Sequence, residues 1–519
     1  MKRLVTTNYI FIYVASLSIL EVVLGFFTTF VYGPAISGDS MYYLSVADNL
    51  LSGRGMIDSF GGSLTNFPPL LPILLSTISR LFHIDVLFTA WVLNVVLMGI
   101  NFILINIWLY RFFQHQKIYF FIASLFVLLS TSNLIMHTSV LSEPLYLTFI
   151  LLFFIYSWKY VEKQAKTSFV ILLLIATLSP LLRFSGFAQI LTAALLIVIV
   201  YRKRFLLAVF LVGIFSVFSL SLIVIWLSLD NFLRYPIFLG DKNQVDFTQN
   251  FLQSLRKILY WFLPYRPFSS DGLLEPLIFL ACMIILLLIL NKKNHWANWL
   301  KSFTHPAVFS MMLFTIIYFI SSTGNIITAH HRDLSSDRYY VVIMLPILVL
   351  LIGIFQFLIR PHIYLENKYL QIIVLAVFTV WSIYPLVKME KFIDISRQGK
   401  PHYYNVYNIH AYQSSATLMQ AKRLLQEKPD AVIYSNVPQL VWLHTRVLTN
   451  ELPKINKNWS EADIIFNLSS WPGERPGYIV FFEKYPYKKY FSLDVLEKIA
   501  NLELIYAMDD GAIFYVSPK

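Results

Sequence analysis

Three charged residues lie directly beside long apolar runs, where each could act on a substrate. Asp39 follows the first apolar run in SGDSMYYLSVADNLL, Glu143 precedes another in TSVLSEPLYL, and Arg183 lies between two further runs in SPLLRFSG. A carboxylate can take a proton from a hydroxyl group, and a guanidinium can bind a phosphate and stabilise a departing negative charge. These residue types could therefore supply a general base and a group that binds an anion.

Each position also has a structural interpretation, which stays open at this stage. Asp39 and Glu143 each stand where a helix is expected to begin, and an acid there is stabilised by the helix dipole. Ser142 and Pro144 would suit the first turn of the helix at Glu143. Arg183 could extend to the membrane surface, although its flanking runs of about 15 residues are too short to span a bilayer fully. A charge held at such depth is usually paired or functional.

Arg338 heads a late apolar run, where it could neutralise a phosphate or pair with a surface acid. HHRD, residues 330–333, contains residue types that bind metals, but its spacing matches no metal site, so metal binding stays unknown. Glu21 lies within the first apolar run and is expected to face other helices.

The composition indicates a membrane protein. Of the 519 residues, 57% are hydrophobic and 13% are charged, whereas soluble proteins carry about a quarter charged residues. The net charge is +12, but Lys and Arg occur in short clusters between apolar runs, which is typical of cytoplasmic loops and not of nucleic-acid binding. Cys282 is the single cysteine, so no intrachain disulfide can form. No nucleotide-binding loop is present.

About eleven runs are long enough to cross a bilayer or nearly so. They cover residues 9–33, 85–111, 118–136, 144–160, 168–182, 186–201, 205–229, 273–291, 305–323, 339–359 and 369–388. The first is long and lacks a small-residue cleavage site, so we expect an uncleaved transmembrane helix.

The loops between the runs alternate in charge, which predicts their orientation. Every second loop is rich in Lys and Arg, and these loops are expected to be cytoplasmic, as is the N-terminus. The acids gather in the other loops, which would face outward; they are Asp39, Asp48, Asp58, Asp85, Glu143, Asp241, Asp246, Asp271, Asp333 and Asp337. The expected location is the plasma (inner) membrane, with multiple passes and an extracytoplasmic C-terminal domain.

Two segments differ from the apolar runs. Residues 68–82, which begin with Pro68 and Pro69, are apolar but short, and they predict a helix lying in the membrane interface. Beyond residue 390, DAVIYSN, GYIVFFEK and GAIFYVSP predict strands, and SSATLMQAKRLLQEKP predicts a helix. The predicted domains are therefore a membrane module of residues 1–389, with an outer loop at 34–84, and a small α/β domain of residues 390–519.

The chain resembles the GT-C class of membrane glycosyltransferases, especially the family 39-like group of protein O-mannosyltransferases and bacterial aminoarabinose transferases. The resemblance is carried by Asp39 in the first outer loop, by Tyr42 or Tyr43 in the following helix, and by Pro68-Pro69. It continues through TSVLSEPLYLTFILL, SPLLRFSGFAQILTAALL and DRYYVVIMLPILVLL and covers most of residues 1–390. Aminoarabinose transferases carry a lysine directly before Pro-Pro, whereas this chain has Phe67.

The resemblance implies transfer of a sugar from a polyprenyl-phosphate donor to a hydroxyl of a glycan, lipid or protein acceptor at the outer membrane surface. Asp39 would be the base of an inverting displacement, and Tyr42, Tyr43, Pro68 and Pro69 would shape the acceptor pocket. Arg183 and Arg338 would bind the donor phosphate. Glu143 would orient the acceptor, assist Asp39 or hold a divalent metal, since relatives differ in metal use.

Two other functions remain open. A transporter of lipid-linked or small substrates would favour internal repeats and charges near the middle of the membrane, but the acids of this chain gather toward one surface. A non-catalytic membrane scaffold would not need Asp39, Glu143 and Arg183 to converge in one pocket.

Overall fold

The computed structural model describes residues 2–62, 67–113, 117–229, 305–328, 338–354, 368–402, 404–454, 471–483 and 490–519, with the single residues 254, 258, 261 and 468. They form two compact units, each discontinuous in sequence. The helical unit comprises Met1–Thr28, Pro68–Leu70 and Val92–Asp394, and the mixed unit comprises Thr29–Phe67, Leu71–Trp91 and Ile395–Lys519. The predicted boundary between a membrane module and a C-terminal domain, at residues 389 and 390, stays a prediction.

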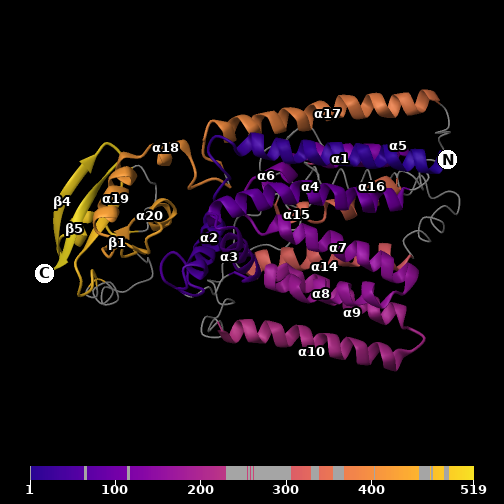
Figure 1. The fold of residues 1–519 in the computed structure, drawn as a ribbon, viewed down its shortest axis with the longest axis horizontal. Helices are drawn as coiled ribbons and strands as arrows, with labels where there is room; N and C mark the ends of the chain where they lie inside the picture. Colours follow the sequence, from indigo (N-terminus) through magenta and orange to yellow (C-terminus); the bar gives the residue numbers. More distant parts are fainter. Residues whose placement is uncertain are drawn as a thin grey trace. The chain divides into compact units, whose positions relative to one another are not determined.

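Long helices that lie side by side make up the helical unit (Figure 1). Helices α1, α4 and α17 also include residues that belong to the mixed unit. The helices are α1 (Lys2–Thr29), α4 (Val86–Phe112), α5 (Lys117–Leu128), α6 (Thr131–His137), α7 (Glu143–Lys163), α8 (Lys166–Leu182), the 3₁₀ turn η1 (Phe184–Gly186), α9 (Phe187–Val200), α10 (Phe205–Leu229), α14 (Pro306–Thr328), α15 (Arg338–Val341), α16 (Met344–Ile354) and α17 (Lys368–Arg397).

Most of the predicted spans coincide with these helices. Residues 273–291 and 355–359 lie outside the described residues, and the described part of the span predicted at 339–359 is divided between α15 and α16. The span predicted at 118–136 is divided between α5 and α6, whose axes differ by 51°. Among the described residues, 4 helices are long and apolar enough to cross a membrane, or up to 5 if the bent pair is one span. The remaining apolar helices, including α8 and α9, are shorter.

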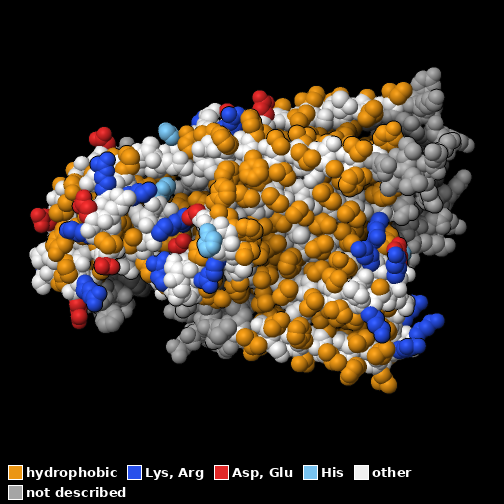
Figure 2. Space-filling view, in the orientation of Figure 1, with side chains coloured by type: hydrophobic (Ala, Val, Ile, Leu, Met, Phe, Trp, Pro, Cys, Tyr) orange, Lys and Arg blue, Asp and Glu red, His pale blue; other side chains and the backbone are white. Residues whose placement is uncertain are grey.

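The surface of the helical unit is apolar. On α10, large side chains such as Leu206 (84% exposed) and Val217 (66% exposed) point outward, and α1 exposes Phe11 in the same way. Hydrophobic side chains accordingly cover much of the face of this unit that Figure 2 shows. Soluble monomers rarely expose continuous apolar patches larger than a few hundred Å². Lipid is therefore the expected surrounding of these helices.

Helix α1 packs closely against α4 because small residues lie at their contact. A Cβ atom on Gly99 would come within 2.7 Å of Val22 Cγ2, and Ser18 Oγ donates a hydrogen bond to the Gly99 carbonyl at 3.0 Å. Glu21 is completely buried, which confirms that it faces other helices. Small residues permit such close helix approach inside a membrane.

A five-stranded sheet with helices packed on it forms the C-terminal part of the mixed unit (Figure 1). The strand order is β2-β1-β3-β5-β4; β1 is parallel to β2 and β3, and β5 is antiparallel to β3 and β4. The elements of the unit are α2 (Gly38–Leu51), α3 (Leu70–Phe82), α18 (His410–Gln413), α19 (Ala416–Glu427), β1 (Val432–Ser435), α20 (Pro438–Thr445), β2 (Thr449–Glu451), β3 (Gly477–Phe482), α22 (Leu493–Leu496), β4 (Ala500–Met508) and β5 (Gly511–Pro518).

The predicted strands and helix of the C-terminal region are confirmed as β1, β3, β5 and α19. The helix predicted at 68–82 is α3. Strands β2 and β4 and helix α20 were not predicted. The predicted fold class, a polytopic helical protein with a small C-terminal α/β domain, is confirmed.

The loop after α1 and the C-terminal region belong to one unit because they share many hydrogen bonds. The carbonyl of Ile36 accepts from the N–H groups of Val406 (3.0 Å) and Tyr407 (3.2 Å), and the Ile36 N–H donates to Asn405 Oδ1 at 3.2 Å. Farther along the loop, the Thr449 N–H donates to the carbonyl of Ser59 at 3.2 Å. The loop after α1 and the C-terminal sheet are thus parts of one unit.

Candidate active site

Two arginines contact one buried carboxylate in the helical unit. Arg183 Nη1 lies 2.7 Å from Glu143 Oε1, and Arg338 Nε lies 3.4 Å from the same oxygen. The Glu143 side chain is 1% exposed, and the two arginine side chains are 16% and 12% exposed. These three side chains carry a combined charge of +1. Such a cluster suits a phosphate, because guanidinium groups match its geometry and keep their charge.

All three residues stand at the ends of elements. Glu143 is the first residue of α7, Arg183 directly follows α8, and Arg338 is the first residue of α15. Exposed basic residues, including Lys163 and Lys203, occupy the opposite ends of α7 to α10. The predicted clustering of Lys and Arg at one end of these helices is therefore confirmed, and the Glu143 cluster lies at the other end.

A tight turn between α8 and α9 positions Arg183. The Arg183 N–H donates to the carbonyl of Ser179 at 2.9 Å, and the Gly186 N–H donates to the Arg183 carbonyl at 2.8 Å. A Cβ on Gly186 would lie 2.2 Å from the Ser179 carbonyl carbon and 2.4 Å from Pro180 N. Only glycine allows this approach, so the sequence SPLLRFSG fixes where Arg183 leaves the helix.

The predicted cap of α7 differs from the one observed. Ser142 is the N-cap residue, but its side chain makes no capping hydrogen bond. Its Oγ instead accepts a hydrogen bond from Arg183 Nη1 at 3.1 Å. Ser142 is therefore part of the arginine cluster, a role that sequence reasoning missed because a serine before a helix usually caps it.

Aromatic rings surround the two guanidinium groups. Arg183 lies 6.0 Å from the ring centroid of Tyr146 and 5.9 Å from that of Tyr339, and Arg338 lies 4.9 Å from the Tyr339 ring. Arg338 Nη2 also donates to the Tyr339 hydroxyl at 3.0 Å. Cations at such distances are stabilised by the ring faces, most strongly where water is excluded.

The loop before Glu143 is held by two asparagines of α4. Asn94 Nδ2 donates to the carbonyl of Ser139 at 2.6 Å, and Asn101 Nδ2 donates to the carbonyl of Pro144 at 2.8 Å. Asn101 Oδ1 in turn accepts from Thr148 Oγ1 at 2.7 Å. Both asparagines are buried, so these contacts fix the start of α7. Their seven-residue spacing on one helix face within an apolar run is the sequence signal that could have found them.

His137 completes this network. Its Nε2 lies 3.0 Å from Asn101 Nδ2, and its Nδ1 lies 2.9 Å from the carbonyl of Asn133. Since the Asn101 amide can only donate through Nδ2, we assign Nε2 as the acceptor and Nδ1–H as the donor, the arrangement of a neutral imidazole.

Asp39 lies in the first turn of α2, in the mixed unit, and is half-buried. Helix α2 is capped by Ser37 and Ser40, which form a capping box, so the cap does not require Asp39. Tyr42 lies one turn farther along, and burial together with Asp58, Glu451 and Asp39 raises its pKa. Tyr42 is therefore surrounded by negative charge and stays protonated at neutral pH.

Phe67 packs against two tyrosine rings of α2. Its ring centroid lies 5.0 Å from that of Tyr42 and 5.3 Å from that of Tyr43. Pro68 and Pro69, which follow it, are buried before α3. Phe67 therefore forms an aromatic cluster with Tyr42 and Tyr43.

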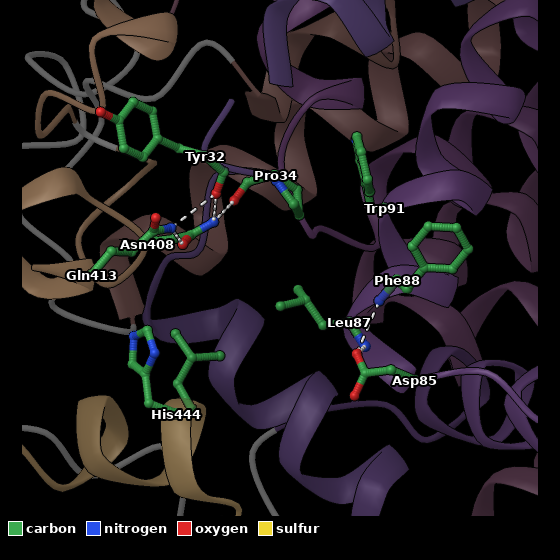
Figure 3. Close-up of a pocket in the computed structure, with 11 residues that line it drawn as sticks. Tyr32, Pro34, Asp85, Leu87, Phe88, Trp91, Asn408, Gln413 and His444 are labelled. Carbon is green, nitrogen blue, oxygen red and sulfur yellow. Dashed lines mark hydrogen bonds between the residues drawn. The ribbon is translucent and has the colours of Figure 1, made fainter. Parts of the chain in front are cut away.

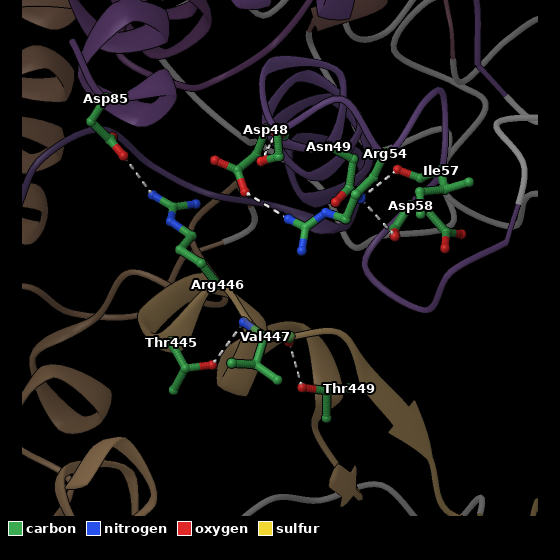
Figure 4. A network of polar contacts seen from close by, with 11 residues as sticks. Asp48, Asn49, Arg54, Ile57, Asp58, Asp85, Thr445, Arg446, Val447 and Thr449 are labelled. Carbon is green, nitrogen blue, oxygen red and sulfur yellow. Dashed lines mark hydrogen bonds and ion pairs between the residues drawn. The ribbon is translucent and has the colours of Figure 1, made fainter. Parts of the chain in front are cut away.

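The two other acids of the loop have structural contacts, and Figure 4 shows the ion pair of Asp48 with Arg54. Asp58 Oδ1 accepts from the N–H groups of Phe60 and Gly62, each at 2.9 Å. Asp48 lies 3.7 Å from Arg54. Burial raises the pKa of both carboxyl groups; in Asp48, the nearby Arg446 and Arg54 oppose this rise. Both acids therefore support the loop around α2.

The structure thus brings Glu143, Arg183 and Arg338 together in the helical unit and places Asp39, Tyr42 and Tyr43 on α2 of the mixed unit. Within the residues the structure describes, no three His, Cys, Asp or Glu side chains gather as a metal site would need. The HHRD segment lies outside those residues.

Similarity to known proteins is found at the level of structure. No protein-family model and no curated protein matches the chain. The crystal structure of ArnT from Cupriavidus metallidurans bound to undecaprenyl phosphate superposes with a TM-score of 0.59 at 11% identity and covers 97% of this chain and 98% of that chain. The apo structure of the same protein gives a TM-score of 0.57 at 11% identity, covering 98% of each chain.

This likeness extends over nearly the whole chain, so the resemblance to aminoarabinose transferases is confirmed for the fold. The fold and the apolar helix surfaces together identify the chain as a polytopic membrane protein with an ArnT-like architecture.

Proposed function

We propose that this chain is a glycosyltransferase that moves a sugar from a polyprenyl-phosphate donor to an acceptor hydroxyl at the outer surface of the plasma membrane. The observation that carries the proposal is the pair of arginines on Glu143, at the end of apolar helices in an ArnT-like fold. ArnT with the same overall architecture was crystallised with undecaprenyl phosphate, a polyprenyl phosphate.

Arg183 and Arg338 bind the donor phosphate in this proposal. Phosphate carries negative charge in the donor and gains more as the bond to the sugar breaks, so two guanidinium groups stabilise the departing lipid phosphate. Glu143 holds both guanidinium groups at one oxygen and thereby sets their separation. Its role is then to position the arginines, and the earlier possibilities of orienting the acceptor or holding a metal are secondary.

Asp39 is the proposed base. It is half-buried beside Tyr42, and a carboxylate there can accept the proton of the acceptor hydroxyl as that oxygen attacks the anomeric carbon. The new glycosidic bond forms as the bond to the phosphate oxygen breaks, and the anomeric carbon is inverted. In this proposal the acceptor packs against the aromatic cluster of Tyr42, Tyr43 and Phe67.

A transfer assay tests the proposal. The purified chain in lipid nanodiscs would be given polyprenyl-phosphate sugars that differ in the sugar, with cell-envelope glycolipids, glycans and peptides as acceptors. Mass spectrometry would follow consumption of the donor and appearance of glycosylated product, and NMR would establish whether its anomeric configuration is inverted. We expect transfer with at least one donor, and loss of transfer in Asp39→Asn.

The same protein and donors also distinguish a transporter and a scaffold from a transferase. Movement of a lipid-linked sugar across a sealed vesicle membrane without glycosylated product would indicate a transporter. Absence of both transfer and movement, with an intact fold, would indicate a scaffold. Retention of configuration in the product would contradict direct displacement.

A further inference from the structure

The polar groups around a cavity of about 420 Å³ in the mixed unit are engaged within the chain (Figure 3). Asn408 Nδ2 donates to the carbonyl of Tyr32 at 2.6 Å, and Gln413 Nε2 donates to Asn408 Oδ1 at 2.6 Å. Asp85 Oδ2 lies 3.1 Å from Arg446 Nη2. These groups hold the segments of the mixed unit together, whereas the cations at one end of the helical unit lack such partners.

Two turns at that end present exposed cations. The turn between α7 and α8 carries Lys163 and Lys166, and the turn between α9 and α10 carries Arg202 and Lys203. All four side chains are exposed, and together they form the basic patch. On the face that Figure 2 shows, Lys and Arg side chains gather at this end of the unit, beside the apolar helix surfaces.

Both turns are ordered, and a hydrogen bond joins them. The Gln164 N–H donates to the carbonyl of Tyr160 at 2.7 Å, and the Arg204 N–H donates to the carbonyl of Tyr201 at 2.7 Å. The Tyr160 hydroxyl donates to the Tyr201 hydroxyl at 2.9 Å, which ties the end of α7 to the end of α9. The basic patch is therefore one surface formed in advance, and such a surface loses less entropy on binding.

The charge of the basic patch is not neutralised within the chain. Among the described residues, no carboxylate forms an ion pair with it, since the ion pairs that the structure shows join other residues. Glu162, the acid next to Lys163, instead accepts a hydrogen bond from Trp158 Nε1. The basic patch can therefore receive an anion.

A lipid-facing surface begins directly beside the basic patch. The first two turns of α10 expose Phe205, Leu206 and Phe210, at 66%, 84% and 62%. Tyr201 stands directly before Arg202, and tyrosine is enriched at the level of lipid headgroups. A ligand that covers both surfaces needs an anionic head and a hydrocarbon part.

We propose that the basic patch binds the headgroup of an anionic phospholipid whose acyl chains lie along α10. A phosphate diester pairs with the guanidinium of Arg202 and with the lysine ammonium groups, and several cations together strengthen attraction to anionic lipid. A zwitterionic lipid brings an ammonium group that these cations repel. An acidic soluble partner would leave the apolar side chains of α10 uncovered. The inference does not depend on glycosyl transfer.

Lipid titration of the full chain tests this assignment. The chain in a nonionic detergent would be mixed with phosphatidylglycerol or with phosphatidylcholine of the same acyl chains, and native mass spectrometry would measure the bound lipid. We expect phosphatidylglycerol to bind more tightly, and Arg202→Gln combined with Lys203→Gln to weaken its binding about tenfold or more. Binding of phosphatidylcholine should not change. Equal affinity of the unaltered chain for the two lipids would overturn the proposal.

Lys422→Gln combined with Arg423→Gln is the matched control, because both residues are exposed on α19 and the net charge changes by the same amount. This variant should bind phosphatidylglycerol as the unaltered chain does. An equal loss in both double variants would mean that binding follows net charge alone, and the basic patch would then be no site. Thermal unfolding without added lipid checks that both variants are folded.

Three further probes identify the ligand class. Glycerol 3-phosphate, which lacks acyl chains, should bind more weakly than phosphatidylglycerol; equal binding would assign the basic patch to a soluble phosphate. Displacement of the lipid by a polyglutamate peptide would assign it to an acidic protein. Arg183→Leu should keep its affinity for phosphatidylglycerol, since Arg183 lies at the other end of α8. Loss of binding in a folded Arg183→Leu chain would place the lipid at the donor site and refute the assignment.

Discussion

At the residue scale, the contacts of Arg183 bear most directly on donor binding. Its Nη1 contacts both Glu143 Oε1 and Ser142 Oγ, and its guanidinium lies near the rings of two tyrosines. We expect Arg183→Leu to weaken binding of undecaprenyl phosphate more than binding of the acceptor. The donor affinity of Arg183→Lys should lie between that of the unaltered chain and that of Arg183→Leu, because an ammonium keeps the charge but lacks the forked geometry. The stabilisation of the chain against heat by added undecaprenyl phosphate measures donor affinity.

The control for this change is Arg204→Leu, since Arg204 is exposed at the opposite end of the helices. A folded Arg183→Leu chain with unchanged donor affinity would assign the phosphate to Arg338 instead. Glu143 is buried, so removing its partner Arg183 can also destabilise the fold. Thermal unfolding of Arg183→Leu is therefore measured both with and without the donor.

The base is tested by a second single-residue change. Asp39→Asn keeps the size of the side chain and its ability to accept a hydrogen bond but removes its basicity. We expect turnover to fall by roughly 10²-fold or more, with little change in donor affinity. Initial rates at saturating donor measure this effect.

Two acids of the same loop provide the comparison. Asp58→Asn keeps an oxygen that can accept from Phe60 and Gly62, and Asp48→Asn keeps the size beside Arg54. Both variants should stay active. Near-normal turnover by a well-folded Asp39→Asn would remove Asp39 from the mechanism and make Glu143 the next candidate for the base.

At the scale of elements, α4 is expected to set the position of α7. Asn101 holds the Pro144 carbonyl from α4, so Asn101→Leu should displace Glu143 and, through it, both arginines. A small displacement of positioned groups can cost about 10²-fold in rate. We expect weaker donor binding and slower turnover, with acceptor affinity unchanged; the heat-stabilisation and transfer assays measure these two effects.

Asn106→Leu provides a matched control for that change. Asn106 is also buried on α4, but its Nδ2 donates to the carbonyl of Phe102 within the same helix. Its replacement should affect stability without a selective effect on the donor. Equal effects of the two variants on donor affinity would mean that Asn101 has only a structural role.

The turn between α8 and α9 makes a separate prediction. A methyl group at Gly186 would meet the backbone of Ser179 and Pro180, so Gly186→Ala should lower the free energy of unfolding by about 1–3 kcal/mol and weaken donor binding through Arg183. Gly213 lies in α10, where an added Cβ would have nothing within 4 Å, so Gly213→Ala should be neutral or slightly stabilising. Thermal unfolding of both variants checks this, and an unaffected Gly186→Ala would show that the turn can rearrange.

Elements with strong periodicity were predictable, whereas contacts between them were not. The long apolar runs and the strands β1, β3 and β5 carry their own signals in residue type and length. Strand β2 has only 3 residues, too few for a pattern, and it depends on pairing with β1. Glu143, Arg183 and Arg338 were singled out individually from their positions beside apolar runs, but their shared ion pairs join residues far apart in sequence. The roles of Ser142, Asn94 and Asn101 likewise depend on tertiary contacts.

At the scale of the whole molecule, orientation in the membrane is the main expectation. We predict that the N-terminus and the basic loops are cytoplasmic and that residues 390–519 are outside. In a Cys282→Ser background, Met419→Cys should react with an impermeant thiol reagent added outside, since Met419 is 52% exposed. Lys203→Cys, at the basic end of the helices, should react only after the membrane is permeabilised. The reverse pattern would invert the topology.

The mixed unit joins the loop after α1 to the end of the chain, which has a consequence for synthesis in the cell. Ile36 pairs with Asn405 and Val406, which the ribosome adds long after Ile36. With residues 34–84 outside the membrane, as predicted above, translation at about 5–20 residues per second would leave this loop without its partner for roughly 20–70 s. During that interval the intervening helices would insert, and the aromatic and acidic side chains of the loop would be accessible to proteases and chaperones.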